Sequence, residues 1–194
     1  GMEVLTVTGA MTIESGTLTH PQSVVKGDPI SDPAAAVADL IANETYRIRI
    51  AAGSVSVGVD GKIDAMGKGY YMNNSGSNTM PYPSHGGMCS GAGCKGYGEP
   101  KEPIHVGLPY KIASGNHYVG KGGGAIYITA TGAVKVDGVI SANSSDGSWA
   151  ENARASGAAG SVYIHAASVS GAGSITADGS NSLEQNNKGV GGRV

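Results

Sequence analysis

The chain has 194 residues and a net charge of −2, with 33 glycines, one Trp and no Phe. Only 14% of the residues are charged and they form no basic block, which argues against nucleic-acid binding. No apolar run approaches the ~20 residues that a membrane-spanning helix needs. The apolar residues make up 40% of the chain and recur periodically, which favours an ordered repeat structure over disorder.

Short runs of alternating apolar residues recur in four segments and predict β-strands. The segment 122–142, GGGAIYITATGAVKVDGVISA, is the clearest, because it holds three such runs separated by Thr, Gly or Asp. A similar pattern occupies residues 4–20, 48–65 and 162–177. Repetition of one three-strand unit is typical of a solenoid.

A glycine marks the point where each later coil opens. The sequence reads GAI at 124–126, GSV at 160–162 and GRV at 192–194. This spacing sets the expected register between coils, and the last of the three begins a further repeat. Because Gly1 precedes a strand with no signal peptide, we expect the chain to be a piece of a longer protein.

Four insertions separate the coils, at residues 21–46, 66–121, 143–159 and 178–190. Each leaves after the third strand of a coil, so we expect all four to stack at one corner, about 4.8 Å apart. Insertions gathered on one face of a repeat protein usually mark its working face. Within the first, Asp32-Pro33 followed by AAAVADLIA predicts a short capped helix.

Aromatic side chains gather in the longest insertion, and Trp149 joins them from the next one. Tyr and Trp combine a broad apolar face with a polar tip, which suits glycan stacking and protein interfaces. The alternative is that a glycine-rich loop needs aromatic residues to pack against itself. The candidate ligand-binding residues are Tyr70, Tyr71, Tyr82, Tyr97, Tyr110, Tyr118 and Trp149.

The two cysteines, Cys89 and Cys94, enclose four small residues in the same insertion. A loop this flexible can close a disulfide, which would suit an extracellular or periplasmic protein. Free thiols are the second interpretation. His85, His105 and His117 lie nearby in the sequence, so zinc binding is the third, although the C-x4-C spacing has no second cysteine pair.

Carboxylates recur at a similar turn position of three coils, at Glu14, Asp60 and Asp137. Carboxylates on adjacent coils would approach the separation used by retaining glycosidases, so Asp60 and Asp137 are the alternative catalytic candidates. The competing interpretation is turn chemistry, since both precede a glycine. Stacked Asp corners, with Asp146 and Asp178, could also take Ca²⁺, but no nonapeptide repeat accompanies them. The sequence indicates no other cofactor and no metal site.

The chain resembles the glycine-rich right-handed parallel β-helix segments of large, chiefly bacterial, surface or secreted proteins of adhesin or autotransporter type. The matching phrases are LTVTGAMTIESGTLTHP, SVGVDGKIDAMGKGY, SHGG, GGGAIYITATGAVKVDGVISANSSDG and GSITADGSNS with GVGGRV. The resemblance implies an adhesin stalk or a display scaffold. The resemblance implies no catalytic motif for this chain.

The sequence therefore predicts one all-β domain over 1–194, a single-stranded right-handed parallel β-helix of about four to five coils. We expect a non-catalytic module at the cell surface or in the extracellular medium. Its partners would be a glycan, a host or cell-surface protein, and neighbouring domains of the parent chain. The alternatives are a polysaccharide lyase or glycoside hydrolase domain and a purely structural spacer.

Overall fold

The computed structural model describes residues 4–24, 46–71, 85, 101–111, 119–147, 155–180 and 191–194. Within these ranges every regular element is a β-strand, and none is a helix. The all-β class predicted from the alternating apolar runs is therefore confirmed. The short helix predicted from Asp32 lies outside the described residues.

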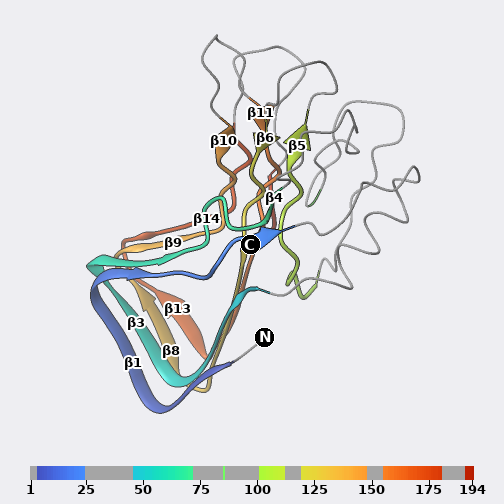
Figure 1. Ribbon diagram of the computed structural model, residues 1–194. Coiled ribbons are helices and arrows are strands. Elements are labelled where there is room, and N and C mark those ends of the chain that lie inside the picture. The colour runs from blue at the N-terminus through green and yellow to red at the C-terminus, as the bar shows by residue number, and fades with distance from the viewer. Residues whose placement is uncertain are drawn as a thin grey trace.

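The main element of the described structure is a curled parallel sheet built on two long, bent strands (Figure 1). β1 (Leu5–Leu18) pairs in parallel with one edge of β3 (Ile48–Asp64). The other edge of β3 pairs in parallel with three short strands in succession, β7 (Ala125–Ala130), β8 (Ala133–Val136) and β9 (Val139–Ser141).

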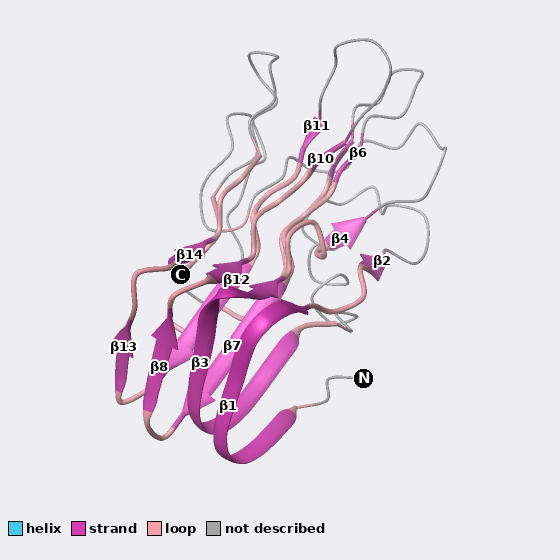
Figure 2. Cartoon of the chain, turned by 90° about the vertical axis from the view of Figure 1, so that its left-hand side faces the viewer, coloured by secondary structure: helices cyan, strands magenta, loops and turns pink. Residues whose placement is uncertain are grey.

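A last set of three strands completes the sheet. β12 (Ser161–His165), β13 (Ser168–Ser170) and β14 (Ser174–Thr176) pair in parallel with β7, β8 and β9 respectively. The chain thus passes along the sheet four times, and each pass lies beside the one before it in the sequence. Figure 2 shows this order, with β1, β3, β8 and β13 side by side.

The first two passes differ from the three-strand pattern expected of them. β1 and β3 each run as one strand through their bends, 14 and 17 residues long. Their pairing absorbs the bends through two register shifts: between Val7 and Ala10 the extra residue is in β1, and between Ile13 and Ser15 it is in β3. A bulge of this kind bends a strand without ending it, which the apolar spacing alone does not reveal.

The apolar side chains stack from pass to pass on the inner face. Alternation is clear in β3, where Ile48 and Ile50 are 6% and 1% exposed while Arg49 between them is half-buried. Three apolar columns run through all four passes, one for each of the three successive stretches of a pass. Their members are Leu5, Ile50, Ile128 and Ile164; Met11, Val55, Val134 and Val169; and Leu18, Ile63, Ile140 and Ile175.

Glycine is required where adjacent passes approach closely. A β-carbon on Gly160 would overlap the carbonyl oxygen of Gly124 in the neighbouring pass. Gly192 in turn lies against Gly160, and its amide donates to Ala177 O at 2.8 Å. The register predicted from the glycine at the opening of each coil is therefore confirmed between these passes.

Six two-residue strands lie beyond one end of the curled sheet, where the insertions leave it (Figure 2). One pair among them is parallel, β2 with β4, and two pairs are antiparallel, β5 with β6 and β10 with β11. Their bounds are β2 Ser23–Val24, β4 Tyr70–Tyr71, β5 Tyr110–Lys111, β6 Val119–Gly120, β10 Asp146–Gly147 and β11 Ala155–Ser156.

Candidate functional site

The four insertions begin beside one another, joined by hydrogen bonds in the order of the passes. Gln22 Nε2 donates to Gly67 O at 3.0 Å, and the Gly67 amide donates to Asn143 O at 2.9 Å. The Ser144 amide then donates to Asp178 O at 3.0 Å, and the Asp178 amide returns a bond to Asn143 Oδ1 at 2.7 Å. We call these five residues the insertion base. They place the starts of all four insertions at one corner.

Above the insertion base, residues 103–109 of the longest insertion are buried or half-buried. Val106 and Leu108 are 0% and 1% exposed, and Ala158 is 0% exposed beside them. The Gly107 amide donates to Gly123 O at 2.7 Å, and the Ala158 amide donates to Leu108 O at 3.0 Å. Residues 101–111 therefore return to the passes on either side of them and are anchored there.

The aromatic candidates divide according to where they lie. Tyr70 is 2% exposed, as the self-packing alternative expects, so its ring contributes to the packed layer. Tyr71 and Tyr110 lie in β4 and β5, at the same corner. The remaining candidates lie outside the described residues: Tyr82, Tyr97, Tyr118 and Trp149, together with Cys89 and Cys94.

The two candidate carboxylates, Asp60 and Asp137, do not share a register position. Val57 pairs with Val136 and Lys62 with Val139, so four residues of β3 face two residues of the next pass at this corner. The corner of β3 is two residues longer, and its Asp60 side chain is exposed. The similar turn position that the sequence suggested for these carboxylates is therefore offset by this bulge.

Asp137 is occupied by contacts within its own corner. Its Oδ2 atom lies 2.6 Å from Lys135 Nζ, and its Oδ1 atom accepts a hydrogen bond from the Ala172 amide at 3.2 Å. The hydrogen bond from Lys135 holds the pKa of Asp137 below its usual value. These contacts make Asp137 a turn-forming residue that links the third pass to the fourth.

A row of stacked side chains on the outer face of the sheet escaped the sequence reasoning. The rings of Tyr127 and Tyr163 stack with centroids 4.9 Å apart and planes 16° from parallel. The Arg49 guanidinium lies 5.6 Å from the Tyr127 ring centroid, and Tyr127 Oη donates to Glu102 at 2.9 Å, which raises the pKa of Tyr127. We call Arg49, Tyr127 and Tyr163 the tyrosine row.

The signal for the tyrosine row was present in the sequence. All three residues sit between two apolar residues, in IRI, IYI and VYI, at the same distance after the opening of a coil. Alternation shows that such residues point outward. Only the register between passes, Arg49 with Tyr127 and Tyr127 with Tyr163, shows that they stack.

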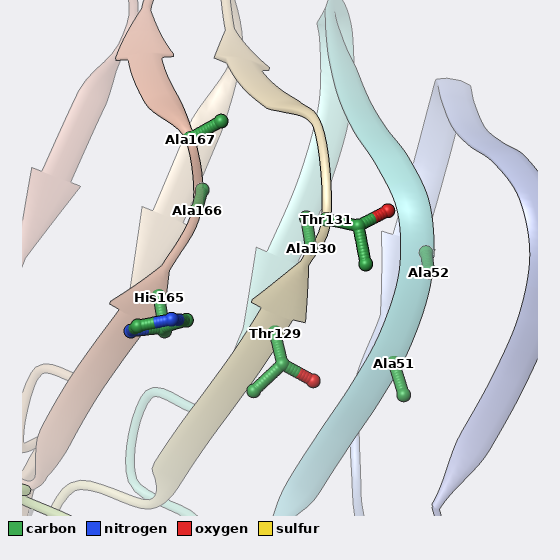
Figure 3. Close-up of a pocket in the computed structure, with 8 residues that line it drawn as sticks. All are labelled: Ala51, Ala52, Thr129, Ala130, Thr131, His165, Ala166 and Ala167. Atoms are coloured by element: carbon green, nitrogen blue, oxygen red, sulfur yellow. The ribbon is translucent and has the colours of Figure 1, made fainter.

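A shallow hollow of about 490 Å³ lies beside the tyrosine row, and Figure 3 shows its lining residues. Its polar groups are Thr129, Thr131 and His165, and the rest of the lining is alanine. Both threonine hydroxyls donate to backbone carbonyls of β3, to Ile50 O at 3.2 Å and to Gly53 O at 3.3 Å. The hollow exists because alanines occupy the bend, where a larger side chain would fill it.

A buried serine and histidine form a further polar cluster. Ser161 Oγ lies 3.3 Å from His85 Nε2, and both residues are 0% exposed. Ser161 Oγ donates its proton to His105 O at 2.7 Å, and Arg193 donates to His85 O at 3.4 Å. Burial, with Arg193 and His105 nearby, lowers the pKa of His85 to about 3. Both side chains are thus enclosed, and the Ser161 hydroxyl joins β12 to the longest insertion at His105.

No group of three or more His, Cys, Asp or Glu side chains in the described ranges is arranged to hold a metal ion. Nor does any helix of sufficient length and apolar character to cross a membrane occur among those residues. Comparison with protein families, with curated proteins and with solved structures finds no match to this chain.

Proposed function

We propose that the curled sheet is a single-stranded right-handed parallel β-helix, a β-solenoid of four to five coils. The support is the order of the passes, each of which pairs in parallel with the pass before it. Right-handed connection is the strongly preferred route between parallel strands of one sheet. Residues 191–194 support a fifth coil, because Arg193 pairs with Ser161 as the earlier openings pair with one another.

We propose that this solenoid is a non-catalytic recognition module of a cell-surface or secreted protein, which binds a glycan or a protein through its insertions. The observation that carries the proposal is the insertion base. Its hydrogen bonds hold neighbouring insertions one strand spacing apart, about 4.8 Å. Loops anchored so closely form one continuous surface, and we propose that it carries Tyr82, Tyr97, Tyr118 and Trp149.

The enzymatic alternative draws no support from the described groups. Asp137 holds a corner together, Asp60 is displaced from it by the bulge, and Ser161 is fully buried. A glycosidase needs two carboxylates facing one substrate bond, and a hydrolytic serine needs an accessible hydroxyl. A binding module needs neither, so recognition is the simpler function for this chain.

The recognition proposal predicts that loop aromatics and sheet aromatics behave differently. Changing Tyr82, Tyr97 or Trp149 to Ala should weaken binding to a ligand found on a glycan array or a cell-binding screen, by about tenfold or more. The melting temperatures of these three variants should stay near that of the unchanged protein. Tyr163→Ala on the outer face is the matched control and should retain binding.

Two outcomes would contradict the recognition proposal. One is an absence of any ligand in both screens, combined with loss of stability in the three loop variants, which would favour a structural spacer. The other is equal loss of binding in Tyr163→Ala, which would place the ligand on the tyrosine row instead of the insertions.

We also propose that Cys89 and Cys94 form a disulfide, in keeping with an extracellular location. Thiol titration of the unfolded protein should then find no free thiol before reduction and two afterwards. Two thiols without reductant would remove this argument for the compartment.

A further inference from the structure

Three neighbouring passes build the hollow beside the tyrosine row. The register pairs Ala51 with Thr129 and Thr129 with His165, so these side chains lie in one line across β3, β7 and β12 (Figure 3). The line is about 10 Å long, because each step between parallel strands is ~4.8 Å. The volume of the hollow, about 490 Å³, lies within the range of about 300–1,000 Å³ that is usual for small-molecule sites.

The polar groups of the hollow are arranged to accept hydrogen bonds. A hydroxyl has one proton to donate and two lone pairs. The protons of Thr129 and Thr131 go to Ile50 O and Gly53 O, so each hydroxyl presents only lone pairs to a ligand. The exposed imidazole of His165 can donate from one ring nitrogen and accept at the other. A ligand that fits must therefore bring hydrogen-bond donors to the two threonines.

The rest of the lining is apolar and carries no charge. It consists of the methyl groups of Ala51, Ala52, Ala130, Ala166 and Ala167. In the adjoining tyrosine row, Arg49 lies over the ring of Tyr127, and Glu102 accepts the hydrogen bond from the Tyr127 hydroxyl. A charged ligand in the hollow would lose hydration and would find no opposite charge in the lining. The lining thus favours a neutral ligand.

A wholly apolar ligand is also a poor match. It would cover the lone pairs of Thr129 and Thr131 and would replace none of their hydrogen bonds to water. A sugar ring meets both requirements, because its C–H groups form an apolar face while its hydroxyl groups donate hydrogen bonds. Small-molecule sites commonly combine an apolar lining with a few placed polar groups in this way.

We propose that the hollow is a binding site for a neutral monosaccharide or disaccharide on the outer face of the sheet. The C–H face of the sugar packs on the alanine methyl groups, and its hydroxyl groups donate to Thr129 and Thr131. A further hydroxyl group bonds to the His165 ring. This site is separate from the insertions, and it does not depend on the recognition function proposed for them.

NMR of the protein with ¹³C-labelled alanine and threonine methyl groups tests where the sugar binds. The neutral probes are methyl α-glucopyranoside, methyl β-galactopyranoside, maltose and cellobiose. At least one of them should shift the methyl signals of Thr129, Ala130 and Thr131, with a dissociation constant on the order of 1 mM. The signals of Thr12 and Ala133, on the outer face of β1 and β8, should stay unchanged. Glucuronate and glucosamine are the charged counterparts and should bind at least about tenfold more weakly.

Variants of the lining test which groups hold the sugar. Ala167→Leu fills the hollow and should weaken binding at least about tenfold, whereas Thr129→Val removes one acceptor and should weaken it about three- to tenfold. Ala133→Leu and Thr12→Val are the matched controls, because both replace exposed residues that do not line the hollow. They should bind as the unchanged chain does. Trp149→Ala should also retain this affinity, which distinguishes the hollow from the insertions.

Four outcomes would overturn the proposal. No neutral probe could shift the methyl signals of the hollow. A charged probe could bind more tightly than its neutral counterpart. Ala167→Leu could keep full affinity although circular dichroism shows that it is folded. Trp149→Ala could lose the binding while Ala167→Leu retains it, which would place the sugar on the insertions and would support the recognition proposal alone.

Discussion

At the scale of single residues, His85 shows how a polar group can be held inside a thin glycine-rich core. Its ring is 0% exposed and contacts Ser161 Oγ, while the Ser161 hydroxyl bonds to the carbonyl of His105. A buried imidazole avoids the cost of desolvating a charge by remaining neutral. The cluster is thus compatible with the fold only while His85 is uncharged.

This burial predicts an acid-sensitive fold. The unfolded chain protonates His85 near pH 6.5, whereas the folded chain does so only near pH 3. Between these values the unfolded state binds more protons, so the free energy of unfolding falls as the pH falls. The loss from this group should be ~2 kcal/mol between pH 6.5 and 5. Burial also lowers the pKa of His20, which acts in the same direction.

Urea unfolding at a series of pH values checks the acid effect. His85→Gln removes the titrating group and should flatten the dependence between pH 6.5 and 5. His165→Gln replaces an exposed imidazole and should leave it unchanged. An NMR titration in which the His85 ring protonates near pH 6 would disprove the explanation.

At the scale of the strand, stability comes from the apolar columns. Ile128 is 0% exposed in the middle of its column, while Ile164 in the last pass is only partly buried. A side chain between two neighbouring passes loses more contacts on truncation than one at an end. Position within the stack, more than residue type, sets the cost of a change.

Ile128→Ala should therefore cost about 3 kcal/mol of unfolding free energy, within the range for fully buried Ile or Leu. Ile164→Ala removes the same atoms from the end of the same column and should cost about half as much. Denaturant unfolding measures both. Equal losses would mean that the last pass is as well covered as the centre.

The strands and their register were predictable because they depend on local pattern. Alternation in AIYITA and AVKV puts Ile126, Ile128, Val134 and Val136 inside, and the opening glycines align the passes. The continuity of β1 and β3 was not predictable, because bulges depend on pairing with the neighbouring strand. For the same reason, the two-residue offset between Asp60 and Asp137 was not predictable from the sequence.

Much less of the candidate site could be predicted. His85 meets Ser161 across 76 residues of sequence, a contact that no local pattern encodes. The stack of Tyr127 on Tyr163 needed the register as well as the alternation. The insertion base was predictable in position, since each insertion leaves after the third strand, but its individual hydrogen bonds depend on turn conformations.

At the scale of the whole molecule, the core and the proposed recognition surface occupy separate regions. The curled sheet holds the apolar columns, and the insertions leave from one corner of it (Figure 2). The passes stack across the sheet through their strand pairs. The insertion corner therefore lies to one side of the apolar columns.

Because of the insertion base, the length of an insertion should have little effect on the stability of the fold. The Gly67 amide bonds to Asn143 O and the Ser144 amide to Asp178 O, and the Asp178 amide bonds to the Asn143 side chain, so the start of each of these insertions is fixed. Lengthening a loop between fixed ends costs only about 0.6 kcal/mol for each doubling. Loops at this corner can thus diverge in size and sequence while the sheet beneath them stays constant, which is how an antibody framework tolerates its variable loops.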